Sequence, residues 1–245
     1  MGNIATDHLS RNGQTTFYDD ELGCFIVHIK PQARRFICRW TKGNVHLTVP
    51  PHATTAQINQ AWTTLRPRMI ANRPTLDFKP GTVIQLDGLS IEIDRQTLEP
   101  NTAIIHSELP TARISIGSDF DNKPDARRDI IDRALKRIAY NVAPRLLLPR
   151  AKQLAAQCGC SPAGWSITYG TRTLGYCTPT KKISLSSNIV FLTQELRDYI
   201  VYHELAHLSE MNHSQRFHQL CNAYCQGREA ALIAALRRHP WPILR

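Results

Sequence analysis

Hydrophobic and polar residues alternate with a period of two through much of the first half of the chain, from about residue 23 to residue 117. The clearest runs are Phe25-Val27-Ile29, Phe36-Cys38-Trp40 and Val45-Leu47-Val49. Alternation places apolar side chains on one face of an extended segment, so these runs predict strands of a half-buried sheet. After Pro50-Pro51, apolar residues recur at helical spacing at Ile58, Trp62, Leu65 and Met69. One helix is therefore expected to interrupt the strands.

Turn signals divide the strands that follow. Asp87-Gly88 stands between the apolar runs 83–86 and 89–93, which is a strong signal for a two-residue hairpin. A further hairpin is expected near Pro110. After the polar stretch 118–124 the hydrophobic period becomes 3.6, and helix predominates to the end of the chain, except that residues 165–185 contain two short alternating runs. These runs predict a small sheet beside the helices.

The change of period near residue 122 predicts an α+β protein with a boundary at that point. We expect residues 1–20 to form a flexible tail and residues 21–121 to form a β-rich N-terminal subdomain. This subdomain is expected to pack on a helical domain over residues 122–245. The chain has 245 residues, of which 42% are hydrophobic, and this is enough apolar material for two parts that share a core. The sequence shows no internal repeat.

The chain lacks the signals of a membrane or secreted protein. No apolar run reaches the roughly 18 residues that span a bilayer, and the N-terminal residues lack the apolar core of a signal peptide. Seven cysteines, an odd number, predict free thiols in a reducing compartment. Cys158/Cys160 and Cys221/Cys225 do not have the spacing of two zinc knuckles. We therefore expect a soluble cytoplasmic protein without a second, structural zinc site.

The formal net charge of +10 is concentrated in residues 123–153, which hold nine Lys or Arg and three Asp. Two interpretations remain open. An apolar helical stripe leaves the basic side chains Arg128, Arg133, Lys136 and Arg137 as a solvated face. Alternatively, the basic surface near residues 127–152 binds nucleic acid or an acidic substrate. The stripe consists of Ile131, Leu135, Ile138 and Val142.

The candidate chemistry lies in residues 195–209, which are apolar on several sides and predict a buried helix. This segment contains His203-Glu204-Leu205-Ala206-His207. Two histidines four residues apart lie over one another on one helix face, which is the spacing that two ligands of a single ion require. Two imidazoles and a carboxylate buried without a partner would cost roughly several kcal/mol. A bound cation removes most of this cost.

A catalytic zinc ion takes three protein ligands, so a third ligand must come from outside this pair. The candidates are His213, Glu210, His218 and Glu229. His213 ranks first, because the helix can end after Leu208, reverse at Met211-Asn212 and present His213 beneath the first two histidines. Asn212 is expected to adopt the left-handed conformation that such a reversal often requires. Ser214 is then expected to cap a following helix.

This constellation predicts hydrolysis at a metal. Three neutral imidazoles with an open position suit zinc better than hard cations, so we expect about one zinc ion per chain. Zinc can activate a water and polarise a carbonyl, while Glu204 can take the proton of the water and pass it to the leaving amine. Cys177 is an alternative nucleophile, but the sequence offers it no dedicated base. The pattern therefore favours amide hydrolysis without a covalent intermediate.

The segment His203–Phe217, HELAHLSEMNHSQRF, closely resembles the YgjP-like metal-dependent hydrolases, relatives of the SprT and WLM zinc metallopeptidases. In that family HELxH is followed by Asn-His-Ser and a Phe. The resemblance extends over nearly the whole chain, including residues 26–50 and 154–162. It implies a short zincin fold with an N-terminal β subdomain. It also implies His203, His207 and His213 as the ligands and Glu204 as the catalytic residue.

Two short segments depart from the family pattern. Residues 173–177, Thr-Leu-Gly-Tyr-Cys, stand where the family has Arg-Trp-Gly-Ser-Cys, and Phe217-His218 stands where it has Phe-Trp. Tyr176 thus replaces a small serine. Its phenol is a candidate donor to a developing oxyanion, or else Tyr176 is a packed aromatic side chain with its hydroxyl at the surface. These departures concern the substrate side of the site, because the ligand positions are intact.

The sequence as a whole predicts a zinc-dependent hydrolase, specifically a metallopeptidase that acts on a peptide or protein. Two alternatives are kept. A metal-dependent nucleotide phosphohydrolase is motivated by the positive charge and by the altered segment 173–177. A nucleic-acid-binding module with a structural zinc site would instead show no turnover and an affinity that depends on salt.

Overall fold

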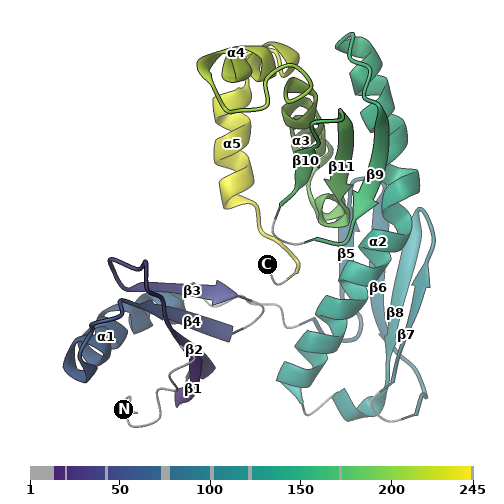
Figure 1. The fold of residues 1–245 in the computed structure, drawn as a ribbon. Coiled ribbons are helices and arrows are strands. Elements are labelled where there is room, and N and C mark those ends of the chain that lie inside the picture. The colour runs from purple at the N-terminus through teal and green to yellow at the C-terminus, as the bar shows by residue number, and fades with distance from the viewer. Residues whose placement is uncertain are drawn as a thin grey trace. The chain divides into compact units, whose positions relative to one another are not determined.

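The structure, a computed structural model, describes residues 14–19, 21–41, 44–72, 78–99, 102–120, 123–170 and 173–243. These residues form two compact units, one up to Thr75 and the other from Leu76 to Ile243 (Figure 1). Each unit has its own hydrophobic core. They are called unit 1 and unit 2.

Unit 1 is a four-stranded sheet, here called sheet A, with one helix on one of its faces. Its strands are β1 (Gln14–Asp19), β2 (Gly23–Ile29), β3 (Ile37–Thr41) and β4 (Asn44–Val49). They lie in the order β1-β2-β4-β3, with β2 and β4 parallel and the other pairs antiparallel. Helix α1 (Thr55–Ala71) begins at a capping box formed by Thr54 and Gln57.

The core of unit 1 lies between α1 and the apolar face of sheet A. Phe25 and Trp62 stack there with ring centroids 4.1 Å apart, and both are almost fully buried. The indole of Trp40 donates a hydrogen bond to the carbonyl of Met69 at the end of the helix. The period-two and helical runs of the sequence therefore meet across one interface, as their apolar faces require.

Unit 2 begins with a second four-stranded sheet, sheet B, of the same topology. Its strands are β5 (Val83–Leu86), β6 (Leu89–Arg95), β7 (Ala103–Ser107) and β8 (Thr111–Ile116), in the order β5-β6-β8-β7. Here too the second and fourth strands are parallel and the others antiparallel. Each sheet is followed by a helix, in this case α2 (Pro124–Gln157) after the short η2 (Ser118–Phe120). The chain thus repeats an arrangement that its sequence does not reveal.

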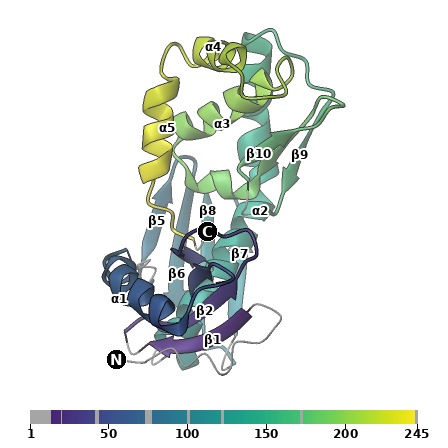
Figure 2. The same cartoon turned by 60° about the vertical axis from the view of Figure 1, so that its left-hand side comes forward.

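A small three-stranded sheet, sheet C, and three more helices complete unit 2. The strands are β9 (Gly164–Thr168), β10 (Gly175–Cys177) and β11 (Lys182–Ser186), in the order β10-β11-β9. After η3 (Ser187–Phe191) come α3 (Gln194–Ala206), α4 (Gln215–Tyr224) and α5 (Glu229–Arg238). Helix α2 contacts sheets B and C and also α3 (Figure 2).

The hairpin of sheet B holds the first turn of α3 in place. The carboxylate of Asp87 accepts a hydrogen bond from the backbone N–H of Gln194 at 2.5 Å. The buried guanidinium of Arg197 donates to the carbonyl of Asp87 at 2.7 Å and to that of Val190. Because these contacts satisfy groups at the start of the helix, they fix where its other end projects.

The predicted α+β class is confirmed, as are the expected strands and helices at these positions. Three features differ from the sequence expectations. Residues 14–19 form β1 rather than part of a tail, and β10 was not expected. The β-rich stretch 21–121 is divided between two units at residues 75/76, because alternation marks strands but does not say which strands pair.

The basic residues of α2 are less available than the sequence indicates. Arg127 is buried and donates to the carbonyl of Phe120, and Lys136 is paired with Asp132 at 2.7 Å. Arg150 binds Asp198 on α3 at the same distance. Lys136 therefore does not belong to the solvated face, whereas Arg133 and Arg137 are exposed as expected. A nucleic-acid partner is not supported. None of the helices in the described ranges is long and apolar enough to cross a membrane.

Candidate metal centre

Two elements bring the three histidines together. His203 lies in the last turn of α3, and His207 caps its C-terminal end. The chain then reverses over residues 208–213, so that His213 lies just before α4, whose N-cap is Ser214. The hydroxyl of Ser214 accepts a hydrogen bond from the N–H of Phe217. This cap, expected from the sequence, fixes the start of α4 and hence the position of His213.

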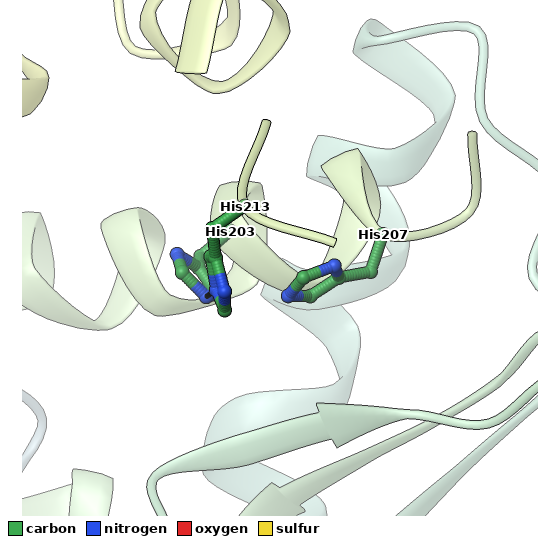
Figure 3. A group of neighbouring side chains, drawn as sticks. All are labelled: His203, His207 and His213. Atoms are coloured by element: carbon green, nitrogen blue, oxygen red, sulfur yellow. Dashed lines mark hydrogen bonds between the residues drawn. The ribbon is translucent and has the colours of Figure 1, made fainter. Parts of the chain in front are cut away.

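The three imidazoles converge on one space. One ring nitrogen of each of His203, His207 and His213 lies within 4.8 Å of the others. The Nε2 atoms of His203 and His213 are 3.1 Å apart, and Figure 3 shows the ring of His207 directed towards the other two. Within the described residues this is the one group of three or more such side chains with this closeness. The arrangement matches the nitrogen ligand set of a zinc site.

The reversal after α3 also orients His207. Its Nδ1 lies 2.9 Å from the carbonyl oxygen of Glu210. A carbonyl only accepts, so Nδ1 carries the hydrogen, and Nε2 of the neutral ring is left with a lone pair for a ligand. The expectation for Asn212 was wrong, because in the described residues only Lys181 and Gln226 are non-glycine residues with positive φ. Asn212 instead accepts a hydrogen bond from the N–H of Ser214.

The ring of Phe217 packs against all three histidines of the cluster. Its ring is fully buried, and its centroid lies 4.9, 4.5 and 4.8 Å from the ring centroids of His203, His207 and His213, respectively. A rigid aromatic side chain in contact with all three imidazoles restricts their orientations. No local pattern of the sequence indicates that this side chain contacts every histidine of the site.

The surroundings of His203 and His213 favour the neutral form of these two imidazoles. Burial, followed by the neighbouring histidines, lowers the pKa of His203 to about 4. Desolvation, followed by His207, also lowers the pKa of His213. A neutral imidazole is the form that binds a metal ion. The site is therefore suited to a cation at neutral pH, because no proton must first be displaced from these two rings.

Glu204 is the buried carboxyl group of the site. Glu204 is 4% exposed, and its Oε2 atom has no hydrogen-bond partner among the described residues. Burial raises its pKa to about 8. A nearby cation would oppose this effect and favour the carboxylate. An unpartnered carboxyl oxygen beside three converging imidazoles therefore fits a bound metal ion.

Gly175 allows strand β10 to approach this carboxyl group. A Cβ atom at residue 175 would lie only 2.7 Å from Oε1 of Glu204, closer than non-bonded atoms approach. Glycine is thus required here by contact rather than by an unusual backbone angle. Local sequence patterns do not single out Gly175, because the contact joins β10 to α3, elements that are distant in the chain.

A cleft of about 470 Å³ opens over the cluster. Segment 173–177 on one side and α3 and α5 on the other contribute to its lining. Besides the three histidines and Glu204, the described lining residues are Thr173, Leu174, Gly175, Tyr176, Cys177, Tyr199, Ile200, Met211 and Leu236. None of them is a lysine or arginine. Apart from the metal-binding candidates and Glu204, the cleft is therefore apolar or neutral.

The comparison with known protein families agrees with this geometry. Residues 34–232 match the model of the YgjP-like metallopeptidase domain. The chain belongs to the YgjP-like family. The jannalysin metallopeptidase zymogen of Methanocaldococcus jannaschii is a similar solved structure, with 21% identity and a TM-score of 0.30 over 37% of this chain and 96% of that one. No curated protein matches the chain.

In this YgjP-like chain, the other candidates for the third ligand, Glu210, His218 and Glu229, lie outside the cluster of three histidines. The carboxylate of Glu210 pairs with Arg216 at 3.0 Å. Nδ1 of His218 lies 2.9 Å from the buried carboxylate of Glu229. Both contacts direct these groups to partners of their own, which leaves His213 as the candidate that joins His203 and His207.

The segment in which this chain departs from the family lies beside the cleft, as expected for a substrate-facing position. Tyr176 is 45% exposed and lines the cleft, so it is not a core aromatic. Cys177 also lines it, but burial raises the pKa of its thiol, and Glu204 acts in the same direction. A thiol with a raised pKa is a poor nucleophile at neutral pH. The structure therefore does not favour Cys177 as a nucleophile.

Proposed function

We propose that this protein is a zinc-dependent metallopeptidase in which His203, His207 and His213 hold one zinc ion. The observation that supports this most directly is the convergence of three imidazole nitrogens within 4.8 Å beside a buried carboxyl group without a partner for Oε2. Membership of the YgjP-like metallopeptidase family supports the reaction class. The histidine donor set favours zinc over Mg²⁺ or Ca²⁺, which take oxygen ligands.

In this proposal the chain supplies the acid–base chemistry through Glu204. A zinc ion bound by the histidines would polarise the scissile carbonyl and make a water molecule more acidic. Glu204 accepts a proton from the attacking water and later donates it to the leaving amine. Gly175 and the surrounding apolar residues keep Glu204 close to β10 and away from solvent. This burial matches its role, because a base with a pKa near neutrality is an efficient proton carrier.

The lining of the cleft favours a peptide over a nucleotide. A nucleoside triphosphate carries several negative charges, and phosphate sites usually provide Lys, Arg or a row of backbone N–H groups. The described lining of this cleft has no lysine or arginine. Its apolar walls suit a peptide with uncharged side chains near the scissile bond. The six described cysteines are free thiols, which is compatible with the cytoplasm as the proposed compartment.

Metal content and peptide cleavage test the proposal together. Protein purified without chelators and supplied with zinc is expected to hold about one zinc ion per chain. The same preparation is expected to cleave peptides in a mixed library, with cleavage sites mapped by mass spectrometry, and chelation should abolish the activity. Protein that binds no zinc under these conditions would contradict the metal site. Protein that binds zinc but releases pyrophosphate or phosphate from nucleoside triphosphates, and cleaves no peptide, would replace the peptidase with the phosphohydrolase alternative.

Tyr176 is proposed to donate its phenol hydrogen to the oxygen that becomes negative during the reaction. Its exposed position on the cleft makes the hydroxyl available to substrate. Tyr176→Phe is therefore expected to lower kcat by at least about tenfold with little change in KM or zinc content. Tyr169→Phe is the matched control, because Tyr169 is similarly exposed at 51% but packs against Tyr140 and does not line the cleft. Equal activity of the two variants would rule out the oxyanion role.

A further inference from the structure

A second cavity lies in unit 1, on the face of sheet A that α1 does not cover. Successive side chains of a strand point to opposite faces of the sheet. Phe25, Val27 and Leu47 face the core of unit 1. His28, Arg39 and His46 line the opposite face. The cavity has a volume of about 670 Å³, and the turn at Pro31 forms part of its border. This volume is in the range of ligand-binding pockets.

The charges of this cavity have one sign. Its ionisable lining residues are Lys30, Arg39, His28 and His46, and no Asp or Glu lines it among the described residues. Lys30 and Arg39 are exposed, and neither forms an ion pair within the described part of the chain. The acidic residues described in unit 1, Asp19 and Glu21, both bind Arg66 instead. An occupant would therefore have to supply the negative charge.

Two histidines in contact with each other and two threonines form a polar part of the cavity lining. Nε2 of His28 and Nδ1 of His46 are 2.7 Å apart, and the two rings are stacked with centroids 4.9 Å apart. This contact holds both rings against the sheet. The hydroxyls of Thr41 and Thr48 also line the cavity. Together with Arg39, these groups supply hydrogen-bond donors of the kind that recognise carboxylate oxygens.

The position of β3 distinguishes a polypeptide from other anions. In the order β1-β2-β4-β3, β3 pairs with β4 and, among the described strands, lies at one edge of the sheet. Ile37, Arg39 and Thr41 are alternate residues of this strand, and all three line the cavity. An extended polypeptide that pairs with the free edge of β3 would place every second side chain on the same face, beside Arg39. A nucleic acid cannot form this ladder of backbone hydrogen bonds.

We propose that this face of sheet A binds an acidic, extended segment of the polypeptide that the enzyme cleaves. Backbone pairing along β3 provides affinity, and Arg39 with Lys30 selects carboxylate side chains. The proposal rests on the peptidase function proposed above, because that function makes polypeptides the class of molecule that the protein meets. It adds a selection by charge outside the catalytic cleft, whose described lining contains no lysine or arginine.

Binding can be tested without turnover. The full chain carrying Glu204→Gln is titrated into two fluorescent peptides, one alternating Glu with Thr and Val, the other with Gln in place of each Glu. The acidic peptide is expected to bind at least about tenfold more tightly, and added salt should reduce this difference. Arg39→Gln is expected to weaken its binding about tenfold. Arg68→Gln is the matched control, since Arg68 is an exposed arginine of α1, outside the cavity lining, and should leave binding unchanged.

Several outcomes would overturn this inference. Equal loss in Arg39→Gln and Arg68→Gln would mean that net charge alone attracts the peptide. Equal binding of the Gln peptide, or tighter binding of an oligothymidylate of the same charge, would exclude selection of an acidic polypeptide. In protein with an intact Glu204, Arg39→Gln should raise KM for substrates with an acidic flank, whereas Arg68→Gln should not. Absence of any cleavage by the unmodified protein would instead count against the peptidase itself.

Discussion

Glu204→Gln is expected to retain about one zinc ion per chain and to lose at least about 100-fold in peptide turnover, the scale typical of general acid–base catalysis. The substitution preserves the size of the side chain but removes the oxygen that accepts a proton. Folding should survive, because Glu204 is 4% exposed and a neutral amide avoids the cost of burying a carboxylate. The measurements are metal analysis and kcat on the best peptide of the library.

Two results would contradict the proposed role of Glu204. A variant that arrives without metal would make Glu204 a ligand or an essential support for the ligands. A variant that keeps both zinc and full turnover would exclude Glu204 as the base. Glu210→Gln is the control, since Glu210 lies in the reversal that follows α3, near the histidines, but its carboxylate binds Arg216 outside the cluster. This control should retain both zinc and activity.

His213→Ala is expected to lower zinc affinity by more than the roughly 10–100-fold that follows loss of an outer partner of a metal ligand, because it removes a ligand itself. Turnover should fall with the metal content. The thermal stabilisation that zinc gives the unmodified protein should also largely disappear, since metal binding is linked to the folded state. Competition with a chelator of known affinity, together with unfolding curves with and without zinc, provides both readouts.

His218→Gln separates this ligand set from its nearest alternative. Nδ1 of His218 contacts the buried carboxylate of Glu229, and the amide of glutamine can maintain a hydrogen bond to that group. Zinc affinity should therefore remain close to that of the unmodified protein. Loss of zinc from His218→Gln together with retention by His213→Ala would reverse the assignment of the third ligand. His207→Ala should behave like His213→Ala.

Much of the local structure follows from the sequence because short-range physics determines it. Alternation predicted β2, β3 and β4, and Asp87-Gly88 predicted the hairpin between β5 and β6, where Gly88 has the positive φ that such a turn requires. The spacing of His203 and His207 placed both on one end of a helix. Each of these features depends on residues within one or two turns of helix or one strand pair.

The third candidate ligand was only partly determined by the sequence. Spacing ranked His213 first but left Glu210, His218 and Glu229 open. The choice depends on where α4 and α5 place these groups, and the structure gives Glu210 and His218 other partners. The left-handed conformation predicted for Asn212 was wrong for a related reason. A hydrogen bond from the N–H of Ser214 to its side chain stabilises the turn without a left-handed backbone.

The sequence alone determined the class of fold, the histidine pair with its glutamate, and the family to which they belong, because motif spacing and periodicity are local properties. The tertiary structure decided which strands pair, and so divided one β-rich stretch into two units with the same topology. It also decided that Gly175 must lie against Glu204 and that Lys136 is paired rather than solvated. The contact of Gly175 with Glu204 joins segments distant in the chain, and the pairing of strands does the same. Lys136 and Asp132 are four residues apart on α2, but their burial depends on which face of the helix is covered. Strand pairing and burial are set by packing rather than by local sequence.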